Sequence, residues 1–119
     1  MSLEITSVFD EGDPEMEHVL LRASAACVIG HYLLANGGAS EDPGGPNRIR
    51  QCYWFPSIEI ESGDFVSLWT KAGKDTVGEM NDGTPIYRFY WSLTKPVWGD
   101  TGNSALLFDL RKWQSFRVH

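Results

Sequence analysis

The chain has few of the residues on which several protein classes depend. It contains two cysteines, Cys27 and Cys52, in 119 residues, which is too few for a disulfide framework or a cysteine zinc site. We expect two buried free thiols, and one disulfide between them is the alternative. No apolar run approaches the ~20 residues of a membrane-spanning helix, and residues 1–4 show no start of a signal peptide. These absences favour a cytoplasmic protein without membrane contact, with the compartment left open if a leader has been removed.

Positive charge is also scarce. Ten Lys and Arg stand against sixteen Asp and Glu, so the formal net charge is −6 and the pI is about 4.9. Phosphate backbones and anionic membrane surfaces attract clustered Lys and Arg, and this composition therefore argues against nucleic acid as a partner. Two basic pairs, Arg48 with Arg50 and Arg111 with Lys112, stand beside apolar residues, and we interpret them as solvated strand edges.

Groupings typical of active sites are missing as well. The three histidines, His18, His31 and His119, show no metal-ligand spacing, and no Gly-x-Ser-x-Gly or phosphate-binding loop is present. Glu59 and Glu61 lie side by side on one predicted strand, whereas paired catalytic carboxylates face each other across a cleft. The sequence therefore predicts no enzyme, no cofactor and no bound transition metal.

Turn residues and strand-forming residues are abundant. Twelve Gly and six Pro separate segments rich in β-branched and aromatic residues, and no segment keeps a helical apolar period over ten residues. The composition predicts one all-β domain spanning 1–119, a β-sandwich with Greek-key connections and eight or nine strands. The expected strands are 3–9, 17–22, 27–34, 48–55, 58–61, 65–71, 86–93, 105–110 and 113–118. The strand 27–34 is expected to be interrupted at Gly30 by a bulge or a close backbone approach.

The connections between these strands are also predicted. The strands 58–61 and 65–71 are expected to pair as a hairpin, because a Ser-Gly-Asp turn joins them. The segments 35–47 and 72–85 are expected to be long polar loops. The acidic segment 10–15 is expected to be a solvated loop, with weak calcium binding by Asp10, Glu11 and Asp13 as the alternative.

The segment 98–109 is expected to organise the fold. Trp98 leads into a turn rich in Gly, Asp and Asn, side chains that tolerate or favour left-handed backbone, and we expect positive φ at Gly102. Both alternating faces of the following strand, 105–110, are apolar. A strand that is apolar on both faces is expected inside a sheet rather than at its edge.

Four earlier segments and the segment 98–109 follow, in order and spacing, a pattern known from one family. The earlier segments read Glu-His-Val-Leu-Leu at 17–21, Val-Ile-Gly-His-Tyr-Leu at 28–33, Tyr-Trp-Phe-Pro at 53–56 and Ile-Glu-Ser-Gly-Asp-Phe-Val at 60–66. Over nearly its whole length the chain resembles the lamin tail domain, an immunoglobulin-like β-sandwich of nuclear lamins and of many bacterial proteins. The late family motif, Trp-x-Asn-x-Gly-Asp-x-Ala-x-Leu-x-Asp, is similar here to Trp98, Asp100, Gly102, Asn103, Ala105, Leu107 and Asp109.

The chain departs from the family pattern at several positions. Asn and Asp are exchanged in the late motif, and His31 stands where Trp is usual. Ser62 replaces a Pro, and the pair Arg111-Lys112 replaces a Gly-containing turn. Because no apolar heptads occur, the lamin rod is absent and the chain resembles a lone tail domain of the bacterial type.

The resemblance implies an immunoglobulin-like Greek-key sandwich in which Trp98, Asp100, Gly102 and Asn103 form a structural motif and Trp98 is buried. It also implies a non-enzymatic interaction or structural module whose partner is another protein. Five tryptophans are more than one small core needs, and Trp is enriched in protein-binding hot spots. Trp54 and Trp69 are the candidate binding surface. The alternative function is a carbohydrate- or surface-binding module in which these two rings stack on sugars, and the oligomeric state stays open.

Overall fold

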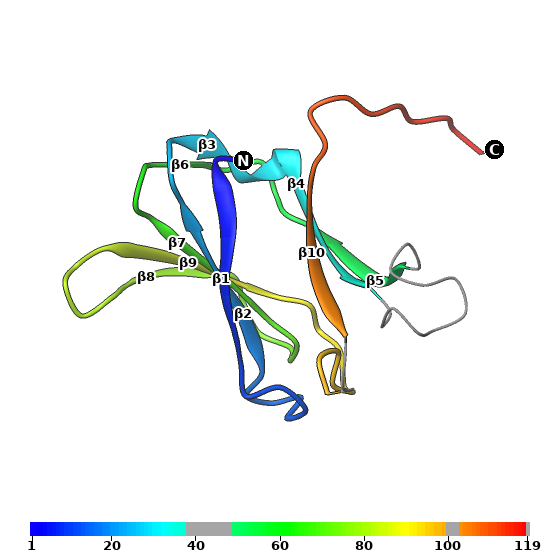
Figure 1. The fold of residues 1–119 in the computed structure, drawn as a ribbon, viewed down its shortest axis with the longest axis horizontal. Coiled ribbons are helices and arrows are strands. Elements are labelled where there is room, and N and C mark those ends of the chain that lie inside the picture. The colour runs from blue at the N-terminus through cyan, green and yellow to red at the C-terminus, as the bar shows by residue number, and fades with distance from the viewer. Residues whose placement is uncertain (38–48, 100–102, 119) are drawn as a thin grey trace.

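The computed structural model describes residues 1–37, 49–99 and 103–118 of the chain. Within these residues the protein is all-β, as predicted, with ten strands and one three-residue 3₁₀ helix (Figure 1). Asp100 and Gly102 of the late motif lie outside the described residues, and so do Arg48 and most of the expected loop 35–47. The positive φ expected at Gly102 therefore stays a prediction.

Eight of the described strands form two main sheets, which Figure 1 shows on the two sides of the molecule. The five-stranded sheet has the order β1 (Leu3–Phe9), β2 (His18–Ala23), β7 (Phe65–Trp69), β9 (Pro85–Tyr90) and β8 (Thr76–Glu79). The three-stranded sheet has the order β10 (Ser104–Asp109), β4 (Tyr32–Gly37) and β5 (Ile49–Trp54). A small third sheet and a 3₁₀ helix join them at one end: β3 (Cys27–Val28), β6 (Glu59–Ile60) and η1 (Ile29–His31).

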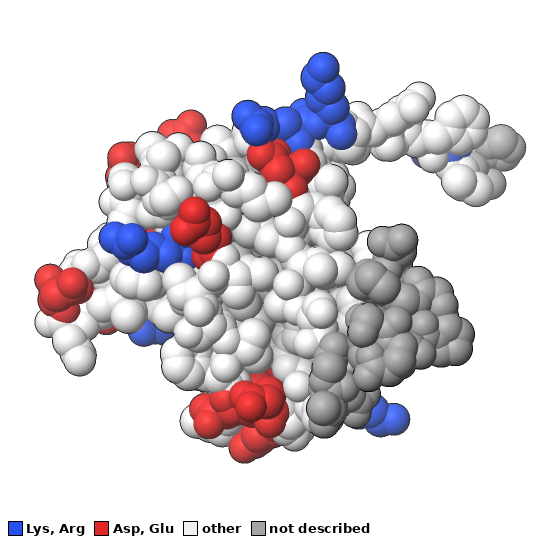
Figure 2. All heavy atoms as spheres, in the orientation of Figure 1, with Lys and Arg blue, Asp and Glu red and all other residues white. Residues whose placement is uncertain are grey.

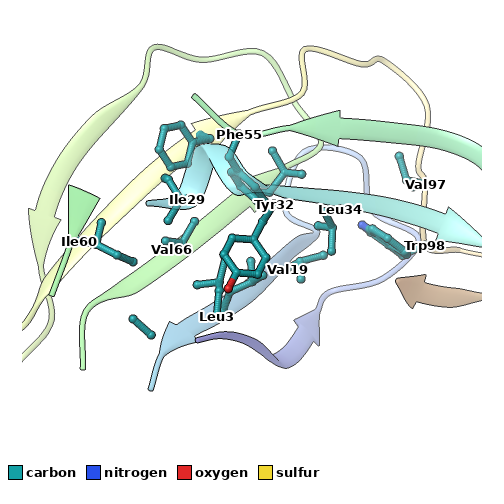
Figure 3. Packing of buried hydrophobic residues seen from close by; sticks show 14 residues of the cluster. Leu3, Val19, Ile29, Tyr32, Leu34, Phe55, Ile60, Val66, Val97 and Trp98 are labelled. Carbon is teal, nitrogen blue, oxygen red and sulfur yellow. The ribbon is translucent and has the colours of Figure 1, made fainter. Parts of the chain in front are cut away.

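The hydrophobic core lies between the two main sheets (Figure 3). Val19 and Leu21 of β2 point inward, as the two-residue period of a strand predicted, and both are fully buried. Leu34 of β4 meets them from the three-stranded sheet. Burying one such aliphatic side chain contributes about 1.5–3 kcal/mol. The remaining fully or nearly buried members of this core are Leu3, Ala23, Ile29, Tyr32, Phe55, Ile60, Val66, Leu68, Phe89, Val97 and Trp98.

The hairpin predicted from 58–61 and 65–71 is wrong, although its turn is present. Gly63 has φ +92°, and the Asp64 carboxylate accepts a hydrogen bond from the Glu61 amide at 2.8 Å. However, β6 pairs with β3, whereas β7 pairs with β2 and, in parallel, with β9. Alternation of apolar residues shows which face of a strand is buried and does not identify the neighbouring strand.

Three further expectations about strands are wrong. The segment 113–118 forms no strand, and the expected loop 72–85 contains β8. The expected strand 27–34 is divided into β3 and β4 by η1, so the described residues hold ten strands instead of eight or nine. The segment 105–110 was expected inside a sheet, but β10 is an edge strand.

Two smaller expectations had mixed outcomes. At Gly30 the close backbone approach is confirmed, because an added Cβ would lie 2.7 Å from the Cα of Ser57. Both cysteines are free thiols, as expected, but neither is fully buried: Cys27 is half-buried and Cys52 is exposed. Cys52 lies on edge strand β5, where neighbouring strands cover a side chain from one side only.

Candidate functional site

A buried carboxylate joins three segments near the late motif. Glu17 is fully buried, and its two oxygens accept hydrogen bonds from the amide of Gly12 at 2.9 Å, the amide of Val97 at 2.7 Å and the hydroxyl of Thr70. A buried carboxylate needs such donors, because burial without hydrogen bonds strongly disfavours a charged or polar group. All donors come from this chain, so Glu17 holds the fold together. Its role was not predicted, since the sequence alone does not show which donors surround it.

The described residues of the late motif also stabilise the fold. Trp98 is 6% exposed, which confirms its expected burial, and its ring lies 6.2 Å from that of Trp91. The carbonyl of Val97 accepts a hydrogen bond from the side-chain Nδ2 of Asn36 and one of 3.4 Å from the side-chain Nδ2 of Asn103. Asn103 therefore holds the chain next to Trp98. These contacts give Trp98 and Asn103 a structural role, although the buried Trp98 Nε1 and Asn36 Oδ1 have no hydrogen-bond partner among the described residues.

Trp54 lies on the face of the three-stranded sheet that is turned away from the core. In the register of this sheet, Trp54 is opposite Leu33, and Leu33 is opposite Phe108. These side chains alternate with Leu34 and Leu107, which pack in or against the core. Together with Leu106 they form an outer apolar surface, which we call the Trp54 face: Leu33, Trp54, Leu106 and Phe108.

The Trp54 ring is held in place and remains partly open to solvent. Its Nε1 donates a 2.7 Å hydrogen bond to the carbonyl of Gly30. Trp54 is nevertheless 45% exposed. Trp113, from the segment after β10, meets it edge to face with ring centroids 4.8 Å apart. A fixed, exposed aromatic ring loses little conformational entropy on binding, which suits a contact surface.

Trp69 lies on the other main sheet, in a row of stacked rings. Its ring is 3.8 Å from that of His18, and the ring of His18 is 5.1 Å from that of Phe9. The Nζ of Lys71 lies 5.2 Å from the Trp69 ring centroid. The rings of neighbouring strands thus cover one another, and Trp69 is not the bare ring on which a sugar would stack.

The structure therefore does not bring the two candidate binding residues together. His18 packs against Trp69 as its cross-strand partner, and Trp54 lies on the outer face of a different sheet. Leu106 and Phe108, which accompany Trp54, could have been found from the sequence, because the strand 105–110 is apolar on both faces. Only the register showed that they share a face with Trp54.

A pocket of about 510 Å³ lies at the end of the molecule near β3, with Cys27, His31, Asp109 and Arg111 in its lining. Arg111 is bound to the Asp109 carboxylate by two contacts of 2.9 and 3.1 Å, which neutralises both charges. Burial raises the pKa of the Cys27 thiol, so it is uncharged at neutral pH and a poor nucleophile. This combination of side chains offers no activated group.

The acidic loop between β1 and β2 is held by its own backbone contacts. The carbonyl of Asp13 accepts hydrogen bonds from the amides of Met16 and Glu17, and its carboxylate accepts one from Glu15. In the described part of the chain, no group of three His, Cys, Asp or Glu residues is placed to hold a metal ion.

No protein-family model matches the chain, and no curated protein matches it either. Over 1–37, 49–99 and 103–118, no helix combines the length and the apolar character needed to cross a membrane.

Proposed function

We propose that this protein is a non-enzymatic interaction module that binds another protein through the Trp54 face. One observation carries the proposal: the three-stranded sheet is apolar on both of its faces, and only one of them covers the core. Leu33, Leu106 and Phe108 are half-buried, and Trp54 is 45% exposed. A contiguous apolar patch on a small protein is typical of an interaction site, and Trp is prominent in binding hot spots.

The charges around this face indicate the chemistry of the partner. Trp113 packs on Trp54, and the segment that carries it also carries Arg111, Lys112 and Arg117. Arg111 is engaged by Asp109. Lys112, next to Trp113, is exposed. The complementary partner is a protein with an apolar contact surface flanked by carboxylates, since opposite charges at a rim speed encounter and select the partner.

The proposed fold is an immunoglobulin-like Greek-key sandwich of the lamin-tail type. Three features support it: two sheets that enclose one core, a buried Trp98, and the contact of Asn103 with the carbonyl of Val97. The parallel pairing of β7 with β9 is a feature that a simple succession of hairpins does not produce. Modules of this fold class carry out many functions, so the fold does not identify the function of this protein. The proposed function is supported by the Trp54 face instead.

Photo-crosslinking in the cells that naturally produce the protein tests this proposal. A photoreactive residue replaces Cys52, an exposed residue beside Trp54 on β5, and a control chain carries it at the exposed Glu4 of β1. We expect one recurrent protein adduct from position 52 and not from position 4. The adduct should disappear with Trp54→Ala or Phe108→Ala, each checked for an unchanged circular dichroism spectrum.

Other outcomes contradict the proposal. Equal adducts from both positions, or adducts that persist in both variants, would show that the Trp54 face is not the binding surface. The alternative function, carbohydrate binding, is tested on a glycan array. Binding of a sugar that is lost with Trp54→Ala would replace protein binding as the function of this face.

A further inference from the structure

The segment after β10 has the composition of a strand but no strand partner. Residues 111–118, which we call the C-terminal arm, are extended and exposed, and Phe116 and Val118 have 86% and 89% of their surface in solvent. Among the described residues, backbone hydrogen bonding along this segment stops at Leu110, whose amide donates to the carbonyl of His31. Phe116 and Val118 alternate with polar residues, as in a strand with one apolar face.

The arm and the rest of the chain carry opposite charges. The arm has three basic residues and no acidic one. Because the formal net charge of the whole chain is −6, the residues outside the arm carry a net charge of −9. Figure 2 shows Lys and Arg at the base of the arm and acidic side chains over the opposite end of the molecule and near the end of β8. A basic, apolar strand is therefore complementary to an acidic strand edge of another copy.

Strand β8 provides such an edge. It is the outermost strand of the five-stranded sheet, and Val77 at its middle is 64% exposed. Asp75, Glu79 and Asp82 lie in or beside it, together with two basic residues, Lys74 and Arg88 of β9, whose guanidinium lies over Gly78. Three other strands form edges of the main sheets: β1, β10 and β5. β5 carries Arg50 and no acidic residue, so charge favours β8 over β5, and the exposed Val77 beside an apolar pocket distinguishes β8 from β1 and β10.

An apolar pocket opens beside β8. It has a volume of about 210 Å³ and is lined by Ile58, Val77, Tyr87 and Phe89, with Asp75 and Thr76 at the side of β8. A cavity of ~150 Å³ is enough to hold benzene, so one phenyl ring fits. Among the arm residues, Phe116 supplies such a ring with no contact of its own to another described ring.

We propose that the C-terminal arm of one copy of this chain adds as a strand to β8 of a second copy, with Phe116 in the pocket beside Val77. Figure 1 places β8 and the arm on opposite sides of the molecule, so the contact forms between copies. Strand addition satisfies the free backbone groups of both segments, and the pocket sets the register. Exchange of arms in both directions closes a dimer, and exchange in one direction builds a longer chain of copies.

Complementation between two variants tests the proposal. One variant lacks residues 111–119, and the other carries Val77→Lys, which places a charge at the pocket and the edge. We expect the full chain to self-associate in sedimentation equilibrium at low salt, each variant alone to be monomeric, and an equimolar mixture to form a heterodimer. The mixture associates because the first variant keeps the pocket and the second keeps the arm.

Two further variants locate the contact. Phe116→Ala should weaken self-association by about tenfold or more, as expected for a ring buried at an interface. Gln51→Lys places the same charge on an edge strand of the other main sheet, β5, and should leave self-association unchanged. A full chain that stays monomeric at ~100 μM would overturn the proposal, because its dissociation constant would then exceed that concentration. So would loss of self-association with Gln51→Lys but not with Val77→Lys.

The two proposals fail independently. Val77→Lys leaves the Trp54 face unchanged, and the crosslinking test from position 52 can be repeated in that background. A recurrent adduct there, together with a monomeric full chain, would support the interaction module and overturn the arm exchange.

Discussion

At the scale of single residues, the fold depends most visibly on a buried carboxylate. Glu17 accepts hydrogen bonds from Gly12, Thr70 and Val97, which belong to three segments distant in the sequence. The residue thereby links the β1–β2 loop, the end of β7 and the chain next to Trp98. Charge-assisted hydrogen bonds of this kind are stronger than neutral ones.

Glu17→Gln should lower the free energy of unfolding by about 1–3 kcal/mol. The amide keeps the shape of the carboxylate, but its NH₂ group faces a donor where an oxygen accepted before. Urea denaturation followed by tryptophan fluorescence measures the change. The exposed Glu15→Gln is the matched control and should change stability by less than about 0.5 kcal/mol. Equal stability of the two variants would show that the network around Glu17 contributes little.

The two thiols should differ in reactivity. Burial raises the pKa of Cys27, whereas Cys52 is exposed on β5. In single-cysteine variants, Cys27 should react with iodoacetamide more slowly than Cys52 at pH 8 and need a more alkaline solution to reach its full rate. Equal pH profiles for the two thiols would contradict this.

The same shift in the pKa of Cys27 has a consequence for stability. The folded state holds the thiol proton more tightly than the unfolded state, so the contribution is fully present below the ordinary thiol pKa of ~8.5. It is lost as the pH rises through the folded-state pKa. The Cys27→Ser variant should therefore lose less stability between pH 8 and pH 10 than the parent chain, as measured by urea denaturation at each pH.

At the scale of elements, the turn η1 requires a residue without a side chain. An added Cβ at Gly30 would lie 2.4 Å from the Oγ and 2.7 Å from the Cα of Ser57. The carbonyl of Gly30 also accepts the hydrogen bond from Trp54. The close packing of this turn on the segment before β6 thus positions the Trp54 face.

Gly30→Ala should destabilise the protein by about 1–3 kcal/mol, the usual cost of overpacking. Because the nearest atoms include backbone, the double variant with Ser57→Gly should recover only part of the loss in thermal denaturation. Full recovery would show that the Ser57 side chain alone sets the limit. An unchanged melting temperature in Gly30→Ala would show that the turn is not closely packed in solution.

The contribution of the segment 98–109 to stability can be tested at Trp98. Its ring is buried against Trp91 and the core, so Trp98→Ala should cost about 3–5 kcal/mol. Trp113→Ala, at a tryptophan that is 62% exposed, is the matched control. If both variants melt at the same temperature, Trp98 is not an organising residue of the fold.

At the scale of the whole molecule, the core and the arm are separate. The core lies between the two main sheets, whereas the arm contributes an edge contact of Trp113 with Trp54 and the pair of Arg111 with Asp109. Removing 111–119 should therefore lower the free energy of unfolding by less than about 1.5 kcal/mol. Denaturation at low micromolar concentration measures this, because self-association would otherwise add apparent stability. Loss of cooperative unfolding would show that the arm belongs to the core.

Much of the architecture could be predicted from local patterns. The strand 3–9 agrees with β1 in both bounds, and the inward faces of Val19 and Leu21 follow from alternation. The strand 113–118 and the loop 72–85 were predicted wrongly for one reason. Strand formation depends on an available neighbour, which β8 finds in β9 and the arm does not find within its own copy.

The sequence by itself determined the all-β class and the inward and outward faces of most strands. These properties follow from side-chain period and turn chemistry, which act over a few residues. Only the tertiary structure decided which strands are neighbours, that Trp54 and Trp69 lie on different sheets, and that Glu17 meets its three donors. Each of these depends on contacts between segments distant in the chain, and such contacts are selected by the packing of the whole core rather than by local preference.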